Sequence, residues 1–405
     1  MVSGNDVFLA IGLHPNTDIK VLLEKMGKKI VSYNAIYKHL KQLEKTILIT
    51  ELNGKYMLIE NDKAKKLFLL LEYCFKNNID YNVVVSEKTA EIVNEGLRKT
   101  TVKGTNFNSK TFKKIITVLE KHGVLVVESK KPIIARIVYS RFLEELVKYF
   151  YGKVKVKEKS FPATINEKKL DSKLMKKFSE YRKLGKTLFE KEEIEFIHSS
   201  LSLEGNTLTL PETEKLIAKN VVPENKPFHE SQEVMDYKKA LDEFLFTEKE
   251  LSLEIILGFH KTAMNWMKKG AGEIRKQNVK IKGNPNFKTP DHRRVPELIK
   301  NFFEKARTTK ANNTVELVEK ASFLHNKFQR IHPFIDGNSR TSRAIFNKVL
   351  IEKDFPVIRI PVGFNDQYLS LTKLSEKRDD KKFCLLMKQI VLENMKLDVK
   401  RLSYA

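Results

Sequence analysis

A helix that must end at a proline is the strongest local constraint in this chain of 405 residues. Apolar residues recur there at spacings of 4, 3, 4 and 3, at Leu317, Ala321, Leu324, Phe328 and Ile331. This spacing places them on one face of a helix that packs into a core. Because Pro333 lacks a backbone N–H, the helix is predicted to end near Ile331. A second helix is predicted over 339–351, and the loop HPFIDGN joins the two.

The start of the second helix has the features of an anion-binding site. Gly337 and Asn338 lie just before it, so free backbone N–H groups and the positive end of the helix dipole point into the loop. Arg340 and Arg343 lie on one side of the first turn. Two guanidinium groups beside a helix N-terminus are suited to binding several phosphates.

His332 and Asp336 add reactive groups to this loop. His332 titrates near neutral pH and can act as a base. Asp336 offers a hard oxygen ligand for a Mg²⁺ ion that bridges phosphates. Alone, a histidine at a helix end is more often a cap, and arginines near a helix start usually face solvent. The combination at this spacing predicts a site for phosphate transfer.

The string HPFIDGNSRTSR resembles the Fic family motif HxFx(D/E)GNGRxxR, which it matches at His332, Phe334, Asp336, Gly337, Asn338, Arg340 and Arg343. The resemblance runs from about residue 191 to about residue 392. It implies an all-helical domain that transfers AMP from ATP to a Ser, Thr or Tyr hydroxyl of a target protein. His332 would then deprotonate the hydroxyl, and Asp336 would hold Mg²⁺. Gly337 and Asn338 would form the anion hole, with both arginines on the outer phosphates.

Ser339 departs from the motif, because it stands where the family has its second glycine. A glycine there would let phosphates approach the backbone closely, or would permit a positive φ. Serine adds a Cβ, although its hydroxyl could contact phosphate or cap the helix. This residue leaves turnover rate and nucleotide choice open, and it removes no catalytic side chain.

A carboxylate on an apolar helix face marks a second constellation. Ile194, Ile197 and Leu201 form a stripe, and Glu204 is its next member. A carboxylate that faces a core is costly unless a cation pairs with it. Gly205 is predicted to end this helix as its C′ residue. The alternative is a glutamate exposed at a frayed helix end.

The segment SLSLEG, from Ser200 to Gly205, resembles the inhibitory motif (S/T)xxxE(G/N) of self-regulated Fic proteins. By this resemblance, the inhibitory helix spans about 191–205, and Glu204 pairs with Arg343 to block the γ-phosphate. Some members of this kind also remove AMP with the same glutamate, so either direction is open here.

The stretch GEIRKQNVKIKGNPNFKTPDHRRVPELI resembles the flap of the family. Alternation from Val279 to Lys282 predicts a short strand and a small β-hairpin. Such a flap would hold the target segment by strand pairing, through its main chain.

The first 62 residues are predicted to form a winged-helix domain. A helical segment covers Ile19 to Met26, Ser32 is a plausible N-cap of the next helix, and Asn53-Gly54 is a strong hairpin signal. This order resembles winged-helix DNA-binding domains, whose recognition helix enters the major groove. The alternative is a protein-interaction module. The candidate DNA contacts are Asn34, Lys38 and Lys41 on the helix and Lys55 on the wing.

The remaining domain boundaries are predicted from the spacing of apolar and charged residues. A helical region over 63–140 includes a second winged-helix-like unit at 109–137, since LEK recurs at Leu43 and Leu119. A helical linker is predicted over 141–190 and the Fic domain over 191–395. The expected fold class is therefore mainly α, with α+β winged-helix units in front.

The composition limits the kinds of partner that we expect this chain to bind. The net charge of +24 favours polyanions, although a lysine-rich surface gives the same number. No apolar run approaches the ~20 residues that span a bilayer, and two distant cysteines are typical of a reducing cytoplasm. We expect ATP, Mg²⁺ and a protein target, which includes the chain itself, as partners. The resemblance also implies pairing of two copies through the Fic domain. Two alternatives remain: a DNA-binding regulator whose Fic domain senses nucleotide, and a Fic enzyme that transfers another phosphate-containing group.

Overall fold

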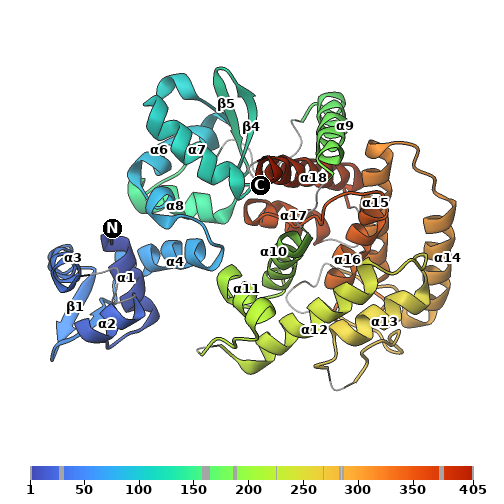
Figure 1. The fold of residues 1–405 in the computed structure, drawn as a ribbon, viewed down its shortest axis with the longest axis horizontal. Coiled ribbons are helices and arrows are strands. Elements are labelled where there is room, and N and C mark those ends of the chain that lie inside the picture. The colour runs from blue at the N-terminus through green and yellow to red at the C-terminus, as the bar shows by residue number, and fades with distance from the viewer. Residues whose placement is uncertain are drawn as a thin grey trace. The chain divides into compact units, whose positions relative to one another are not determined.

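The computed structural model describes residues 2–26, 32–156, 165–185, 189–224, 226–267, 269–281, 284, 287–373 and 378–403. The chain divides into two compact units, Met1–Lys159 and Ser160–Ala405, which Figure 1 colours from blue to red along the chain. The boundary falls inside the stretch 141–190 that we predicted as a linker. Helix α8 (Arg141–Tyr151) belongs to the first unit, and α9 (Glu167–Lys183) belongs to the second.

The first unit begins with helices and a hairpin in the predicted order. They are α1 (Gly4–Leu13), α2 (Ile19–Lys25), α3 (Tyr33–Lys45), β1 (Ile49–Leu52) and β2 (Lys55–Leu58). Ser32 Oγ accepts a hydrogen bond from the N–H of Ala35 and so caps α3 as predicted. Asn53 and Gly54 both have positive φ, at 52° and 76°, which is the tight turn that joins two antiparallel strands.

The rest of this unit repeats the arrangement with a larger sheet. Its elements are α4 (Asp62–Lys76), α5 (Tyr81–Val84), α6 (Glu87–Lys99), β3 (Thr101–Lys103), the 3₁₀ turn η1 (Gly104–Asn106), α7 (Ser109–Lys121), β4 (Leu125–Lys130), β5 (Ile133–Ile137) and then α8. Strand β5 lies between β3 and β4, and both pairings are antiparallel.

Helices α3 and α7 are equivalent elements of this repeat. Each has 13 residues, and each leads into the hairpin through the same kind of turn. The N–H of Leu48 donates to the carbonyl of Leu43 over 3.1 Å, and the N–H of Val124 donates to that of Leu119 over 2.9 Å. The residue before each donor has positive φ. In both halves, the last strand also pairs with a segment that lies earlier in the chain. In the first half, β2 forms an isolated bridge with the segment before α2. In the second half, β5 pairs with β3, which lies before η1.

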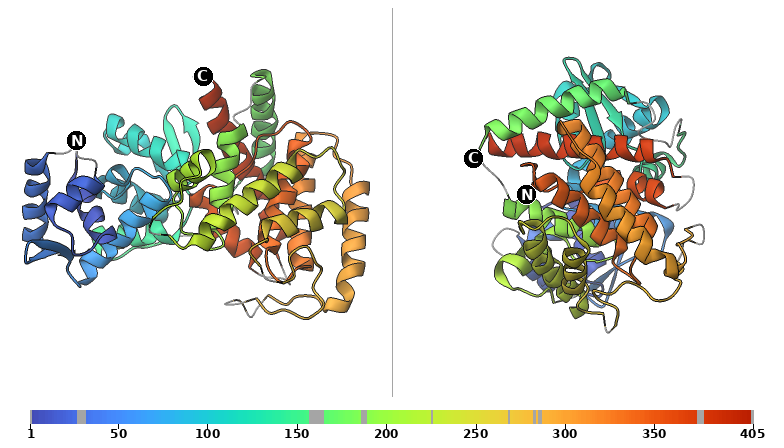
Figure 2. Two further views of the ribbon diagram at one scale, coloured as in Figure 1. Left: turned by 60° about the horizontal axis from the view of Figure 1, so that its bottom comes forward. Right: turned by 90° about the vertical axis from the view of Figure 1, so that its right-hand side faces the viewer.

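Among the described residues, the second unit contains helices and no strand. Its helices after α9 are α10 (Phe189–Ser202), α11 (Leu210–Lys219), α12 (Phe228–Leu245), α13 (Leu253–Ala263), α14 (Val295–Thr308), α15 (Thr314–Ile331), α16 (Asn338–Ile351), α17 (Asn365–Thr372) and α18 (Asp380–Leu402), with 3₁₀ turns η2 (His292–Arg294) and η3 (Val362–Phe364). Helix α15 packs against α16 and α18, and α9 lies alongside α18 (Figure 2). This arrangement confirms the mainly helical fold, and it places the two helices of the motif in the core of the unit.

The flap segment, residues 276–290, does not form the predicted hairpin in its described part. Val279 to Ile281 form no strand, and Lys282 lies outside the described residues. The base of the segment is instead closed by side chains, since Thr289 Oγ1 donates to the carbonyl of Val279 over 2.8 Å. Among the described residues no strand pairs with Val279 to Ile281, so alternation alone misled the prediction.

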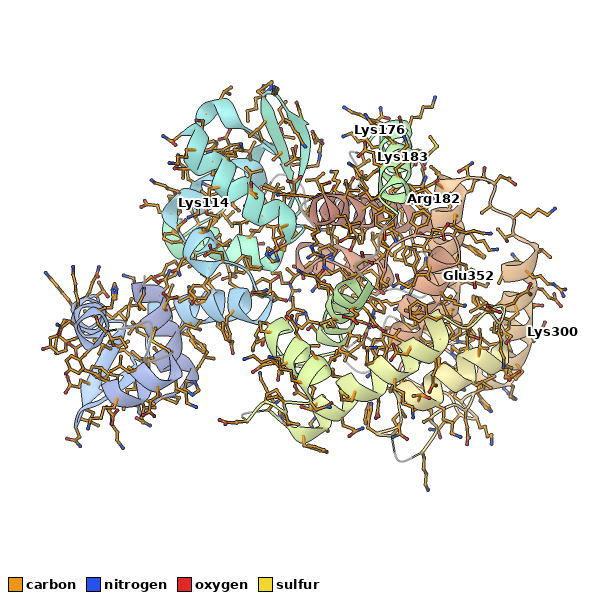
Figure 3. All side chains as sticks on the ribbon, viewed as in Figure 1. Lys114, Lys176, Arg182, Lys183, Lys300 and Glu352 are labelled. Atoms are coloured by element: carbon orange, nitrogen blue, oxygen red, sulfur yellow. The ribbon has the colours of Figure 1, made fainter. Side chains whose placement is uncertain are left out.

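Positive charge is spread over both units rather than gathered in one place. Lys114 on α7, Lys176 and Lys183 on α9 and Lys300 on α14 are exposed, and Figure 3 labels them among the outward side chains. No helix within the described ranges is long and apolar enough to cross a membrane.

Candidate active site

His332 occupies the end of α15, where the backbone turns out of the helix. Its φ is 51°, in the left-handed region, and its N–H still bonds to the carbonyl of Phe328 at 3.0 Å. Its ring Nδ1 lies 3.3 Å from the carbonyl oxygen of Gln329. A carbonyl only accepts, so Nδ1 carries the proton and Nε2 presents a lone pair. Burial lowers the pKa of His332 to about 4, against the opposing effect of the Gln329 carbonyl. The imidazole is therefore neutral at pH 7.

The motif loop, residues 332–338, is closed by the side chain of Asn338. Its Oδ1 accepts from the N–H of Phe334, and its Nδ2 donates to the carbonyl of the same residue, both at 2.9 Å. Phe334 itself is buried, as the motif predicts for its core anchor. Both polar atoms of the Asn338 side chain are thus used inside the loop, so only its backbone N–H is left for the predicted anion site.

Gly337 is required by its conformation and by its neighbours. Its φ is 76°, and a Cβ built there would lie 2.9 Å from Met264 Sδ and 3.0 Å from His260 Nε2. The first intrahelical bond of α16 runs from the N–H of Thr341 to the carbonyl of Gly337. The N–H groups of residues 338–340 therefore have no acceptor within the helix, and they form the helix N-terminus at the loop.

His260 on α13 supports the motif loop, and no sequence pattern indicated this role. The N–H of Gly272 donates to its Nδ1 over 2.8 Å, so its Nε2 carries the proton and donates to the carbonyl of Asp336 over 2.9 Å. Its ring stacks on Phe334 with centroids 3.7 Å apart. Burial lowers the pKa of His260 to about 4. Because it lies on the apolar face of its helix, its pattern is that of an ordinary core histidine.

Asp336 is the predicted metal ligand, and its side chain is 50% exposed. Its Oδ1 accepts from the N–H of Gly337 at 2.6 Å and from Arg340 Nη2 at 3.3 Å. Within the described part of the chain, Oδ2 has no such bond. One half-exposed carboxylate oxygen fits Mg²⁺, which binds through one or two carboxylates and the phosphates of a substrate. Among the residues that the structure describes, no group of three or more His, Cys, Asp or Glu side chains is arranged so that it could hold a metal ion.

Arg340 is paired with a carboxylate that sequence reasoning missed. Its side chain is only 4% exposed, and it forms an ion pair with Glu233 of α12. Asn206 Nδ2 donates to the other oxygen of Glu233 over 2.9 Å. Burial raises the pKa of Glu233, although Arg340 opposes this effect. Glu233 adjoins the apolar face of α12 beside Val234. This position was the one sequence feature that could have indicated a buried, paired carboxylate, but no sequence pattern identifies Arg340 as its partner.

Arg343 brings together the predicted inhibitory residues. Its Nη2 donates to Glu204 Oε1 over 2.7 Å and to the carbonyl of Ser200 over 2.9 Å, and its Nε donates to Ser200 Oγ over 2.8 Å. Burial disfavours the charge of Arg343, but the Glu204 carboxylate outweighs it and raises the pKa of the guanidinium. The ion pair that the sequence demanded for Glu204 is present.

The end of α10 fixes Glu204 in place. Gly205 has a φ of 102°. The N–H of Gly205 bonds to the carbonyl of Ser202, and the N–H of Asn206 bonds to that of Leu201, which is the Schellman pattern with Gly205 at C′. The helix therefore ends in a defined cap and not in a frayed turn.

Tyr237 of α12 links this cap to the motif helix. Its hydroxyl lies 3.0 Å from Ser200 Oγ and 3.3 Å from the carbonyl of Arg340. The carbonyl accepts, so the Tyr237 O–H donates to it, and the Ser200 O–H donates to Tyr237. The chain of hydrogen bonds from Arg343 through Ser200 and Tyr237 to the Arg340 carbonyl is thus fully satisfied.

Ser339 lies in the first turn of α16, so the site has helical backbone at this position and does not require a glycine for its φ. Its Oγ accepts from Gln329 Nε2 over 3.2 Å, and Gln329 Oε1 accepts from Arg378 Nη1 over 3.2 Å. The hydroxyl is therefore built into a polar chain that a glycine could not join.

The predicted DNA contacts belong to the first unit. Asn34 and Lys38 are exposed on α3, and Lys55 is exposed on β2. Lys41 is also exposed and pairs with Glu44 at 2.8 Å. These residues share one helix and its hairpin, as predicted.

Residues 250–350 match the model of the Fic/DOC family. The matched residues lie within the second unit. Protein adenylyltransferase Fic from Drosophila grimshawi is 29% identical over 191 residues, which are 46% of this chain and 39% of that protein. The protein of the same name from Drosophila melanogaster is 27% identical and is covered over 38% of its length. The chain thus spans less than half the length of these relatives.

Solved Fic structures share the fold. A Fic-domain signalling protein from Bacteroides thetaiotaomicron superposes with a TM-score of 0.50 at 22% identity, over 57% of this chain and 98% of that one. A Fic family protein from Desulfovibrio desulfuricans gives a TM-score of 0.51 at 22% identity, over 59% and 76% of the two chains. At this identity the likeness establishes the fold alone.

Proposed function

We propose that this chain is a protein adenylyltransferase, which transfers AMP from ATP to a Ser, Thr or Tyr hydroxyl of a protein target. The observation that carries the proposal is a neutral His332 whose Nε2 is an acceptor, beside a helix N-terminus and two buried arginines. Relatives of 27–29% identity that bear the name protein adenylyltransferase support it.

In this reaction His332 Nε2 takes the proton of the target hydroxyl. The oxygen then forms a bond to the α-phosphorus of ATP, and the bond from that phosphorus to the bridging oxygen of pyrophosphate breaks. The products are an AMP ester on the target and pyrophosphate. The neutral state of the imidazole suits a base, because a protonated ring could not accept the proton.

The phosphates have matching groups on this chain. The N–H groups at the start of α16 and the guanidinium of Arg340 would bind the anionic oxygens. Asp336 Oδ2 would hold Mg²⁺, which when bound neutralises phosphate charge. The Ser339 hydroxyl, oriented by Gln329, is positioned at the same helix end.

Glu204 is proposed to keep the site inactive. Its carboxylate occupies Arg343 Nη2, the position at which the resemblance places the γ-phosphate. A bound carboxylate and a bound phosphate cannot share one donor at this distance, so ATP must displace Glu204 to bind productively.

Two forms of labelled ATP test the donor chemistry. Incubation of the Glu204→Gly variant with ATP labelled at the α-phosphate should label the protein, while ATP labelled at the γ-phosphate should not. Label from the γ-position alone would show transfer of another phosphate-containing group and contradict the proposal. A Ser339→Gly variant beside the native chain shows whether the departure from the motif limits the rate.

For the first unit we propose two winged-helix modules, on the strength of the repeated order of helices, bridge and hairpin. DNA binding through α3 stays a prediction. Salt-sensitive binding that is lost when Lys38 and Lys41 become alanine would support it, because each phosphate contact releases a counterion. We also propose a cytoplasmic location, which the free thiols of Cys74 and Cys384 support.

A further inference from the structure

Arg275 is a buried cation that forms no ion pair with a carboxylate among the described residues. The residue is 3% exposed, and burial lowers the pKa of its guanidinium, partly offset by Asp291. Its side chain donates only to backbone carbonyls: Nε to His332 over 2.8 Å, Nη1 to Gln277 over 3.0 Å and Nη2 to Pro290 over 2.6 Å. A buried charge is costly unless it is hydrogen-bonded, so a guanidinium whose three nitrogens each bond to a backbone carbonyl calls for an explanation.

The three carbonyls belong to two functional segments. Gln277 and Pro290 lie at the two ends of the flap segment, so one guanidinium closes its base. The third carbonyl is that of His332, and the backbone N–H of Arg275 also bonds to the carbonyl of Pro333 over 2.9 Å. Arg275 therefore ties the base of the flap segment to the start of the motif loop.

A second contact joins the same two segments from the other side. The ring of Phe287, within the flap segment, lies with its centroid 5.3 Å from that of His332. Arg378 covers the Phe287 ring at 5.2 Å. His332 is thus held between its own carbonyl bond to Arg275 and an aromatic side chain of the flap segment, so a shift of the segment moves the imidazole.

We propose that Arg275 is a positioning residue that makes the described ends of the flap segment, 276–281 and 287–290, and His332 one rigid frame. A target segment docked along the flap then presents its hydroxyl at a fixed place relative to Nε2. This inference rests on the proposed adenylyltransferase activity. It assigns to Arg275 the alignment of base and target, and no part in nucleotide binding.

The test uses the full chain with Glu204→Gly as parent, and adds Arg275→Lys or Arg275→Ala. Lysine keeps the charge but lacks the planar fork, so it cannot hold three carbonyls. We expect kcat for AMP transfer to fall about 10- to 100-fold, as for small misplacements of reacting groups, while KM for ATP changes less than about threefold. Added guanidinium ion should restore part of the kcat of Arg275→Ala. The matched control is Arg307→Lys, the same change at an exposed position on α14, which should match the parent.

Hydrogen exchange gives a readout that does not depend on activity. Thr289→Val removes only the bond from Thr289 to the carbonyl of Val279, yet a rigid frame predicts faster exchange both in 276–281 and in the motif loop. Hydrogen exchange in Thr289→Val still tests the inference if the Arg275 variants fail to fold. Unchanged kcat in Arg275→Lys, equal loss of kcat and ATP affinity, or faster exchange confined to the flap segment would each overturn the inference. A Glu204→Gly parent that transfers no AMP contradicts the proposed function instead, and exchange then decides the inference alone.

Discussion

The motif loop and the SLSLEG segment (residues 200–205) meet at α16 but are held in opposite ways. The loop is fixed by buried groups that each satisfy a backbone atom: Asn338 on Phe334, and His260 on the carbonyl of Asp336. The Glu204 carboxylate, by contrast, has one hydrogen bond within the described ranges, to Arg343, and its side chain is 26% exposed. The loop is therefore preorganised, whereas the carboxylate can be exchanged for another anion. The predictions below test this difference.

Replacing the predicted base should have the largest effect. His332→Ala removes the acceptor for the target proton but leaves the arginines and the helix N-terminus intact. We expect AMP transfer to fall by about 10²–10⁴-fold, the usual contribution of a general base, with ATP affinity retained. The rate of label transfer and the Kd for ATP, measured on the same protein, check this separation.

Removing the Glu204 carboxylate should have the opposite effect and raise the rate of AMP transfer. Glu204→Gly frees Arg343 from a charge-assisted hydrogen bond worth about 1.5–3 kcal/mol, so AMP transfer should rise about 10- to 100-fold. The same change leaves a buried guanidinium without its carboxylate, so the melting temperature should fall without ATP and recover with it. Equal rates of AMP transfer in the native chain and in Glu204→Gly would contradict the claim that ATP must displace Glu204 from Arg343.

Adding one methyl group to the motif loop should lower both stability and the rate of AMP transfer. Gly337→Ala forces a residue with a Cβ to keep a left-handed φ, at a cost of about 1–2 kcal/mol, and pushes against Met264 and His260. We expect lower stability of the second unit and weaker transfer together. Trp266 is the only tryptophan in the chain and lies 6.0 Å from the guanidinium of Arg340, so its fluorescence follows the unfolding of this unit.

Weakening the link between the two regions should give a smaller gain. Tyr237→Phe removes the hydroxyl between Ser200 and the Arg340 carbonyl and keeps the ring in the core. Loss of about 1 kcal/mol of hydrogen bonding should raise transfer by about fivefold, less than Glu204→Gly does. If the two changes are combined, the tyrosine change should add little, because its effect runs through the same helix cap.

The last prediction concerns the pH dependence of stability and not the rate of transfer. The pKa of His260 is about 4 in the folded protein, below its usual value of 6.5, so the unfolded chain binds more protons between these values. This group's contribution to stability is present above about pH 6.5 and is lost as the pH falls toward 4. The free energy of unfolding of the native chain, relative to that of His260→Gln, should therefore decrease over this window. Urea unfolding at pH 7, 5.5 and 4.5 gives the comparison, and a constant difference would show that His260 is not held neutral.

The sequence predicted those features that depend on neighbours along the chain. The end of α15, the cap of α3 and the turn at Asn53-Gly54 follow from proline, serine and Asn-Gly chemistry. Glu204 was also accessible, since an acid on an apolar stripe demands a cation. Together with the motif, this was enough to place the candidate site.

The residues that support the site were not accessible. Arg275, His260 and Tyr237 act through backbone carbonyls or through partners far away in sequence, and no spacing rule reports such contacts. Glu233 pairs with Arg340 across 107 residues of chain. The flap was misjudged for a related reason: alternation indicates a strand only where a partner strand supplies the ladder, and here side chains close the segment.

The most direct test of the account is a mass spectrum of Glu204→Gly protein after incubation with ATP and Mg²⁺, beside the same protein carrying His332→Ala. The account predicts an added AMP mass on the first and none on the second. If both proteins gain AMP equally, His332 is not the base. If neither gains AMP, even with Ser339→Gly included and candidate target proteins supplied, the site does not transfer AMP and the central claim is wrong.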